Sequence, residues 1–232
     1  MKKILLLAML ACGLTAFAHT SNEDRDSNDG VKIVKGDEDL DVSTHIAVGV
    51  NVPTGAPDGY KFAPFRSWNI DWTVVQLDYQ PKRRKQTYSI GVGLGWHNYS
   101  LKKNDTYFVK DEHNVVGLAT VPSNMKKDYS RLHEMAIIVP VLFNQSFSKK
   151  FSVSLGAQVN FNIKGRLKWG YTSGDDSYDI TTKGIEYKVV TLDLMAVFHV
   201  NDGGFYVKYN PISPFKKDKG PDFKYLAFGI YF

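Results

Sequence analysis

An alternation of apolar and polar residues runs along the chain from Phe151 to Lys164. The odd positions from Phe151 to Ile163 are apolar, and the even positions hold small, amide or, once, charged side chains. Successive strand side chains point to opposite faces, so the pattern predicts a strand with one apolar and one polar face. The strand exceeds the usual length of about 5–6 residues and suits the about 9–11 residues of a tilted membrane-spanning strand. We therefore expect its apolar face to contact lipid and its polar face to line a narrow lumen.

Seven further segments show the same alternation. They are residues 44–52, 67–79, 87–99, 132–144, 186–200, 204–210 and 223–232. The phase slips at Val74-Val75, which predicts a β-bulge, and Pro140 inside its strand indicates another. Gly91, Gly93 and Gly95 share the inward face of the third strand and are expected to leave room for long side chains from opposite strands. A phosphate-binding glycine loop is disfavoured because no helix pattern follows.

The connections alternate in length. Short ones follow the second, fourth and sixth strands, and longer ones follow the others, with Leu101 to Arg131 the longest. An even number of strands with short turns at one end and long loops at the other is typical of bacterial outer-membrane barrels. The predicted fold class is all-β, an eight-stranded antiparallel up-and-down transmembrane β-barrel. Its long loops would face outside the cell, and both ends of the mature chain would be periplasmic.

The N-terminal part divides into two segments. Residues 1–18 combine a basic start, an apolar run and Ala16-Phe17-Ala18, which predicts a secretory signal peptide cleaved after Ala18. A lipoprotein signal ending at Cys12 is the alternative; Cys12 is the only cysteine, so the mature chain would have none. Residues 19–43 are acidic and polar and are expected to form a flexible periplasmic lead-in. They lack the ligand spacing of an EF-hand calcium loop. The barrel is expected to span residues 44–232.

Composition agrees with this assignment. Beyond the signal peptide there is no apolar run long enough for a transmembrane helix. A slightly negative mean hydropathy is expected for a barrel, because half of each strand is polar. The aromatic content of 13% suits girdles of aromatic residues at the membrane interfaces. Loss of Lys2 and Lys3 with the signal peptide lowers the net charge from +5 to +3, which is too mild to indicate nucleic-acid binding.

The last strand carries a family resemblance. Tyr225-Leu226-Ala227-Phe228-Gly229-Ile230-Tyr231-Phe232 ends on an aromatic residue with apolar residues at alternate positions, and it resembles the signal read by the outer-membrane assembly machinery. Over residues 44–232 the chain resembles the OmpX-like and PorT-like small barrels. The segments 138–142 and 205–211 resemble the PorT-like group. This resemblance implies a Gram-negative outer membrane, but the class includes adhesins, anchors, secretion accessories and a few enzymes.

Six charged residues are expected to face the lumen: Asp71, Asp78, Glu134, Lys164, Asp193 and Lys208. Buried charges must be paired, so they predict a network of ion pairs and hydrogen bonds that stiffens the barrel. A proton or ion path is the alternative. The interior of an eight-stranded barrel is just wide enough to be filled by side chains, so a wide diffusion pore is not expected.

Enzymatic chemistry has one candidate location. The histidines are His19, His45, His97, His113, His133 and His199, and no pair has the spacing of a zinc motif. His97 and His133 are expected near the outer rim with Ser100, Ser130 and Glu134, where a lipid-modifying enzyme would keep its site. A Ser-His-carboxylate triad is recognised by geometry, however, and fold alone carries no function. We therefore predict a non-enzyme without catalytic, cofactor or metal residues.

The long loops offer the better functional surface. They combine lysines with aromatic residues, among them Tyr107, Phe108, Tyr129, Trp169, Tyr171 and Tyr178. Such a surface can bind glycans, lipopolysaccharide phosphates or a protein, although a solvated loop with an interfacial aromatic belt explains it equally well. The basic run Lys82-Arg83-Arg84-Lys85 indicates a solvated turn or contact with acidic head groups.

The predicted function is therefore an integral outer-membrane barrel with a structural or loop-mediated binding role. Its expected partners are outer-membrane lipid and lipopolysaccharide, the assembly machinery through the last strand, and an extracellular ligand or a periplasmic secretion partner. The alternatives are a secretion or assembly accessory barrel, a lipid-modifying rim enzyme and a soluble lipocalin-like carrier. The carrier would have its apolar face inside, and the glycine- and amide-rich polar faces of residues 87–99 and 151–164 disfavour it.

Overall fold

The computed structural model describes residues 31–35, 38–81, 85–102, 105–201 and 203–232. The expected signal peptide, the first part of the expected lead-in and residues 82–84 of the basic run lie outside them. The described elements are strands and a short 3-10 helix, in chain order β1 (Val31–Lys35), β2 (Glu38–Thr54), the 3-10 helix (Pro64–Arg66), β3 (Trp68–Gln80), β4 (Gln86–Ser100), β5 (Thr106–Lys110), β6 (Val116–Thr120), β7 (Lys126–Ser148), β8 (Phe151–Ser173), β9 (Asp176–Thr182), β10 (Val190–Val200), β11 (Gly203–Asn210) and β12 (Lys224–Tyr231). In this part of the chain no helix is long and apolar enough to cross a membrane.

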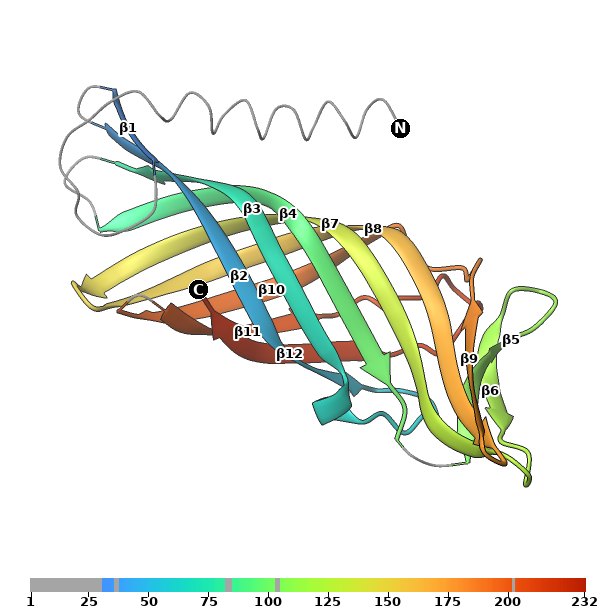
Figure 1. Cartoon of the computed structure of the whole chain (residues 1–232). Coiled ribbons are helices and arrows are strands. Elements are labelled where there is room, and N and C mark those ends of the chain that lie inside the picture. Colours follow the sequence, from blue (N-terminus) through green and yellow to red (C-terminus); the bar gives the residue numbers. More distant parts are fainter. Residues whose placement is uncertain (1–30, 36–37, 82–84, 103–104, 202) are drawn as a thin grey trace.

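Eight strands form a closed antiparallel ring (Figure 1). Their order is β2, β3, β4, β7, β8, β10, β11 and β12, and β12 pairs with β2 to close it. Phe232 extends the closing pair, because its backbone exchanges hydrogen bonds of 2.9 and 3.0 Å with Ile46. This ring confirms the prediction of an all-β, antiparallel fold with eight principal strands.

The two faces of the ring differ in polarity. On β8, the side chains of Ser154, Gln158 and Asn160 are buried inside the ring, whereas Leu155 and Phe161 are 55% and 42% exposed outside it. The same alternation holds along β3, β4, β7, β10, β11 and β12. Apolar residues therefore cover the outside, and the interior holds buried polar side chains together with apolar ones such as Ile138, Met195 and Val197. The apolar outer face is the reverse of the facing that a lipocalin-like carrier requires.

Short and long connections lie at opposite ends of the ring (Figure 1). At one end, which we call the short-turn end, lie the end of β3 and the start of β4, the turn that joins β7 to β8, the end of β10 and the start of β11, and Phe232. At the other, the long-connection end, lie residues 55–67, 101–102, 105–125, 174–189 and 211–223. The predicted alternation of short and long connections is confirmed.

Strand structure extends beyond the expected limits. β1 pairs with the start of β2, so residues 31–35 and 38–43 of the expected flexible lead-in lie in a sheet. β7 and β8 continue past the ring at the long-connection end, where β9 adds to β8 and β5 pairs with β6. In the extension of β8, Leu167, Trp169 and Tyr171 alternate with Arg166, Lys168 and Thr172, so the sequence carried a strand pattern there that was not used.

Two predicted bulges have different outcomes. The bulge at Val74-Val75 is confirmed by a register shift between Thr73 and Val75. The bulge at Pro140 is wrong, because Pro140 pairs in register with Gln158 and no shift occurs there. The missing N–H of proline coincides instead with a gap in the pairing to β4.

An unexpected shift separates Met135 from Ala136, which pair with Lys164 and Asn162. The extra residue on β8 reverses the facing of everything after it. Lys164 is consequently exposed on the outer face, and its predicted inward position is wrong.

Candidate functional site

Asp71 on β3 is the centre of a polar network inside the ring. Its carboxylate accepts hydrogen bonds from Lys208 Nζ on β11, from His97 Nε2 on β4 at 3.1 Å, and from Gln158 Nε2 on β8 at 3.2 Å. Neither β8 nor β11 neighbours β3 in the ring, so these contacts cross its interior. Lys208 and Asp71 are both buried. The middle of the ring is therefore filled by side chains from four strands.

Asp193 extends this network on the far side of Lys208. Its Oδ2 lies 3.7 Å from Lys208 Nζ, and its Oδ1 accepts hydrogen bonds from Asn210 Nδ2 at 2.6 Å and the Tyr225 hydroxyl at 2.8 Å. The buried charges are thus paired, as their burial requires. The predicted ion-pair network exists for Asp71, Asp193 and Lys208.

The other predicted lumen charges lie apart from this network. Asp78 accepts hydrogen bonds from Ser43 at 2.7 Å, from Gln76 at 2.8 Å and from Ser89, nearer the short-turn end. Glu134 faces inward and is buried, but its Oε1 has no hydrogen-bond partner. The described side chains therefore place the inward charges in more than one group.

The glycines of β4 serve neighbouring strands more than opposite ones. A Cβ on Gly95 would lie 2.9 Å from Asp71 Oδ1 and 2.9 Å from a methyl group of Ile138. Asp71 and Ile138 belong to β3 and β7, the strands that pair with β4. The prediction that these glycines leave room for long side chains from opposite strands is wrong at Gly95, because the side chains that occupy the space come from adjacent strands.

An apolar cluster closes the interior at the long-connection end. Phe62, Phe108, Ile185 and Phe215 come from the long connections and pack against residues of the ring. The ring of Phe223 lies 4.9 Å from that of Phe62 and 5.3 Å from that of Tyr99. The long connections therefore fold over the end of the ring instead of extending away from it.

Polar contacts hold the same connections together. Lys216 Nζ donates to Glu186 Oε2 at 2.6 Å, and this hydrogen bond lowers the pKa of the Glu186 carboxyl. Burial raises the pKa of the Tyr60 hydroxyl, which reaches toward the carbonyl of Val116. These contacts join segments that are far apart in the sequence.

The rim histidines do not meet the rim serines. His97 points inward to Asp71, whereas His133 points outward, and its ring centroid lies 6.2 Å from that of Trp68. The hydroxyl of Ser130 accepts from the backbone N–H of Phe108 at 2.9 Å, and that of Ser100 faces the Leu101 carbonyl at 3.5 Å. These residues therefore form no Ser-His-carboxylate arrangement. The described residues also contain no group of three or more metal-ligating side chains.

Four aromatic residues from separate segments stack at the long-connection end, and we call them the aromatic stack. Tyr107 on β5 stacks on Trp169 at 3.7 Å, Trp169 on Tyr171 at 4.6 Å, and Tyr171 on Tyr178 of β9 at 5.1 Å. The interplanar angles are 12°, 27° and 18°. The sequence singled out all four residues, but their meeting depends on the pairing of β8 with β9 and on the position of β5.

The aromatic stack has the properties of a recognition surface. Tyr178 at its edge is 46% exposed, and the buried indole Nε1 of Trp169 has no hydrogen-bond partner. Tyr and Trp combine large apolar faces with a polar group, which suits contact with a sugar ring or a protein side chain. The neighbouring Lys127 has a structural role, since it donates to the carbonyls of Lys102 at 2.7 Å and Thr106 at 2.5 Å.

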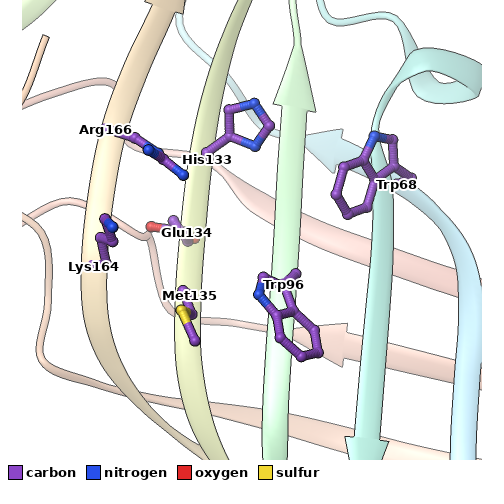
Figure 2. Close-up of a pocket in the computed structure, with 7 residues that line it drawn as sticks. All are labelled: Trp68, Trp96, His133, Glu134, Met135, Lys164 and Arg166. Carbon is purple, nitrogen blue, oxygen red and sulfur yellow. The ribbon is translucent and has the colours of Figure 1, made fainter. Parts of the chain in front are cut away.

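A shallow pocket of about 80 Å³ lies on the outer face of the ring (Figure 2). It is lined by Trp68, Trp96, His133, Glu134, Met135, Lys164 and Arg166, which come from β3, β4, β7 and β8. Sequence reasoning missed this site because it placed Lys164 in the lumen. The signal available was the alternate spacing of Lys164, Arg166 and Lys168.

Comparison of the chain with protein-family models and with curated proteins gives no match. These comparisons identify no family for the chain. The chain is a largely antiparallel β-sheet protein whose strands close into a ring of eight.

Proposed function

We propose that this protein is an integral β-barrel of a bacterial outer membrane, without enzymatic activity, that binds its ligand through the long connections. The observation that carries the proposal is the apolar outer face of the closed ring. Every strand of the ring exposes large apolar side chains there, among them Val48, Trp72, Ile90, Val141, Leu155, Leu194, Phe205 and Phe228. Soluble proteins rarely expose apolar patches above a few hundred Å². In lipid, by contrast, a closed ring satisfies its backbone hydrogen bonds internally.

The orientation follows from the two ends. Short periplasmic turns and long extracellular loops are the rule for bacterial barrels. The long-connection end would then face outside the cell, and the start of β2 and Phe232 would lie in the periplasm. In this orientation the aromatic stack is presented to the extracellular medium.

Binding is favoured over transport by the packing of the interior. The network around Asp71 fills the middle of the ring, and the apolar cluster fills its long-connection end. An eight-stranded barrel interior is just wide enough for such side chains. The aromatic stack is therefore the proposed binding surface, for a glycan or a protein partner.

The experiment that tests membrane insertion is fractionation followed by gel electrophoresis with and without boiling. We expect the mature protein in the outer-membrane fraction, resistant to alkaline extraction, and migrating faster in the unboiled sample. A closed barrel keeps its compact form in detergent until it is heated, which explains the expected shift. A protein found in the soluble fraction with no shift would refute the proposal.

A further inference from the structure

Three consecutive cross-strand pairs on the outer face of β7 and β8 are rich in basic residues. Arg131 pairs with Lys168, His133 with Arg166, and Met135 with Lys164. The members alternate along each strand, so all six side chains share one face. We call Arg131, His133, Lys164, Arg166 and Lys168 the basic ladder. Figure 2 shows Arg166 and Lys164 on β8 beside His133 and Met135 on β7.

The basic ladder brings like charges together without an ion-pair partner in the part of the chain that the structure describes. Like charges directly opposite each other on neighbouring strands are destabilising, and Arg131 faces Lys168 in this way. His133 lies on the same face, directly opposite Arg166 and one outward position from Arg131. Among the described residues, no carboxylate forms an ion pair with any cation of the ladder.

Carboxylates close to the ladder are engaged or directed elsewhere. Asp128 on β7 accepts a hydrogen bond of 2.9 Å from the Thr172 hydroxyl. Asp179 on β9 accepts a hydrogen bond of 2.6 Å from the Tyr129 hydroxyl. Glu134, between two ladder positions, is one of the residues that line the pocket, but its side chain is buried toward the interior of the ring. The Arg131 guanidinium lies 4.0 Å from the centroid of the Tyr129 ring, and its Nε is buried without a hydrogen-bond partner. A bound anion would therefore reduce the repulsion between the ladder cations and could accept a hydrogen bond from the unpaired Arg131 Nε.

The position of the basic ladder indicates the kind of anion. Toward the short-turn end, the next outward residues on the same strands are Ile137, Phe161 and Ile163, which belong to the apolar outer face. Trp68 and Trp96 lie beside the ladder in the pocket of Figure 2. Tryptophan is enriched where a membrane meets water. The cations thus lie where the apolar surface ends, at the level of lipid head groups in the proposed orientation.

We propose that the basic ladder and its pocket bind the phosphorylated head group of a glycolipid in the outer leaflet. The inference rests on the proposed membrane insertion. Arginine forks bind phosphate oxygens in a bidentate manner, and lysine adds compact charge. The acyl chains of the same lipid would lie on Met135 and Trp96, which continue into the apolar surface. A lipid satisfies both requirements, whereas free phosphate satisfies only the first.

The test uses the full mature protein in phosphatidylcholine nanodiscs that contain a diphosphorylated glycolipid of the lipid A type. Retained glycolipid is counted by native mass spectrometry. The variant is Arg131→Gln, Arg166→Gln and Lys168→Gln together. Its control, Lys149→Gln, Lys150→Gln and Lys217→Gln, removes the same charge from exposed lysines elsewhere. We expect roughly 100-fold weaker retention in the ladder variant and unchanged retention in the control, from about a fivefold effect for each cation near an anionic surface.

Two further arms separate the possible sources of the phosphate. We expect the natural protein to retain the dephosphorylated glycolipid only weakly. This retention should be as low as that of the phosphorylated glycolipid by the ladder variant. Inorganic phosphate should compete only poorly. Equal retention of both glycolipids, or equal losses in both triple variants, overturns the inference while leaving insertion intact. Efficient displacement by inorganic phosphate overturns the assignment to a lipid.

Insertion itself is read in the same samples from the shift on unboiled gels. A natural protein that fails to insert would overturn the proposed function and the inference together. Insertion without selective retention overturns only the inference.

Discussion

At the scale of single residues, one carboxylate organises the interior. Asp71 contacts side chains from β4, β8 and β11, and Gly95 leaves the space in which its Oδ1 lies. Lys208 is fully buried and has Asp71 as its hydrogen-bonded counter-ion, with Asp193 further away at 3.7 Å. A buried charge that loses its partner costs far more than a surface ion pair contributes. The pairing of Asp71 with Lys208 is therefore expected to dominate the stability of the interior.

Replacement of Asp71 tests this role. We expect Asp71→Asn to lower the free energy of unfolding by about 3–5 kcal/mol, because Lys208 then keeps its charge with only the more distant carboxylate to balance it. The measurement is urea unfolding in detergent micelles, followed by tryptophan fluorescence. Asp58→Asn, in an exposed connection, is the matched control and should leave the midpoint unchanged. Equal midpoints for the two variants would show that the ion pair contributes little.

At the scale of strands, the sequence predicted facing well wherever one side was apolar. The alternation in residues 67–79 and 186–200 indicated the inward positions of Asp71 and Asp193 correctly, and the slip at Val74-Val75 gave the bulge. The prediction of facing failed after Ile163. The bulge there reverses which residues face inward, and the next three residues, Lys-Gly-Arg, include no large apolar side chain that would mark the change. Facing beyond that point depends on pairing with β7, which one strand's pattern cannot reveal.

A cation on the apolar outer face of β8 tests the facing assignment. Leu155 is 55% exposed there and pairs with Phe143 and Ala196. We expect Leu155→Arg to destabilise the inserted protein by about 2–4 kcal/mol, the cost of a cation near the bilayer midplane of a barrel. The inserted fraction in liposomes, read from unboiled gels, measures the effect. Val109→Arg, on β5 beyond the ring, is the control for an exposed apolar residue. Normal insertion of Leu155→Arg would contradict the lipid-facing assignment.

The aromatic stack shows a second limit of sequence reasoning. Tyr107, Trp169 and Tyr178 were each noted as loop aromatics, yet residues 126–131 and 165–173 were not expected to be strands. Because β8 continues and β9 pairs with it, Tyr171 and Tyr178 become direct cross-strand partners. The residue types were readable from the sequence, whereas their meeting required the long-range register.

Loss of the central rings tests the stack as a binding surface. We expect Trp169→Ala with Tyr171→Ala to abolish glycan or protein binding to intact cells, with an unchanged shift on unboiled gels. Removing both rings deletes the contact area without touching the closed ring of strands. The measurement is a glycan array followed by titration of the best ligand. Tyr88→Ala, near the short-turn end and 51% exposed, is the control and should bind normally. Undiminished binding by the double variant would exclude the stack as the site.

At the scale of the whole molecule, strand pairing closes the ring and side chains fill its interior. The pairing of β12 with β2 and the hydrogen bonds between Phe232 and Ile46 close the ring around its axis. The Asp71 network and the cluster around Phe223 then fill it along its axis, at two separate levels. The strand pairing leaves no unpaired strand edge in the ring. Because side chains fill the interior, the outer face and the long connections are the surfaces that can contact other molecules.

The two interior levels lead to a prediction about conductance. We expect the natural protein to give no stable channel in a planar lipid bilayer, since ions would have to pass both the buried charges and the apolar cluster. Phe62 belongs to the apolar cluster at the long-connection end and comes from one of the long connections. The Phe62→Ala variant should also give no channel, because the Asp71 network is unaffected. Single-channel recording on protein that shifts on unboiled gels provides the measurement. Regular conductance steps from the natural protein would mean that the interior opens, and that the protein transports ions as well as binding through its connections.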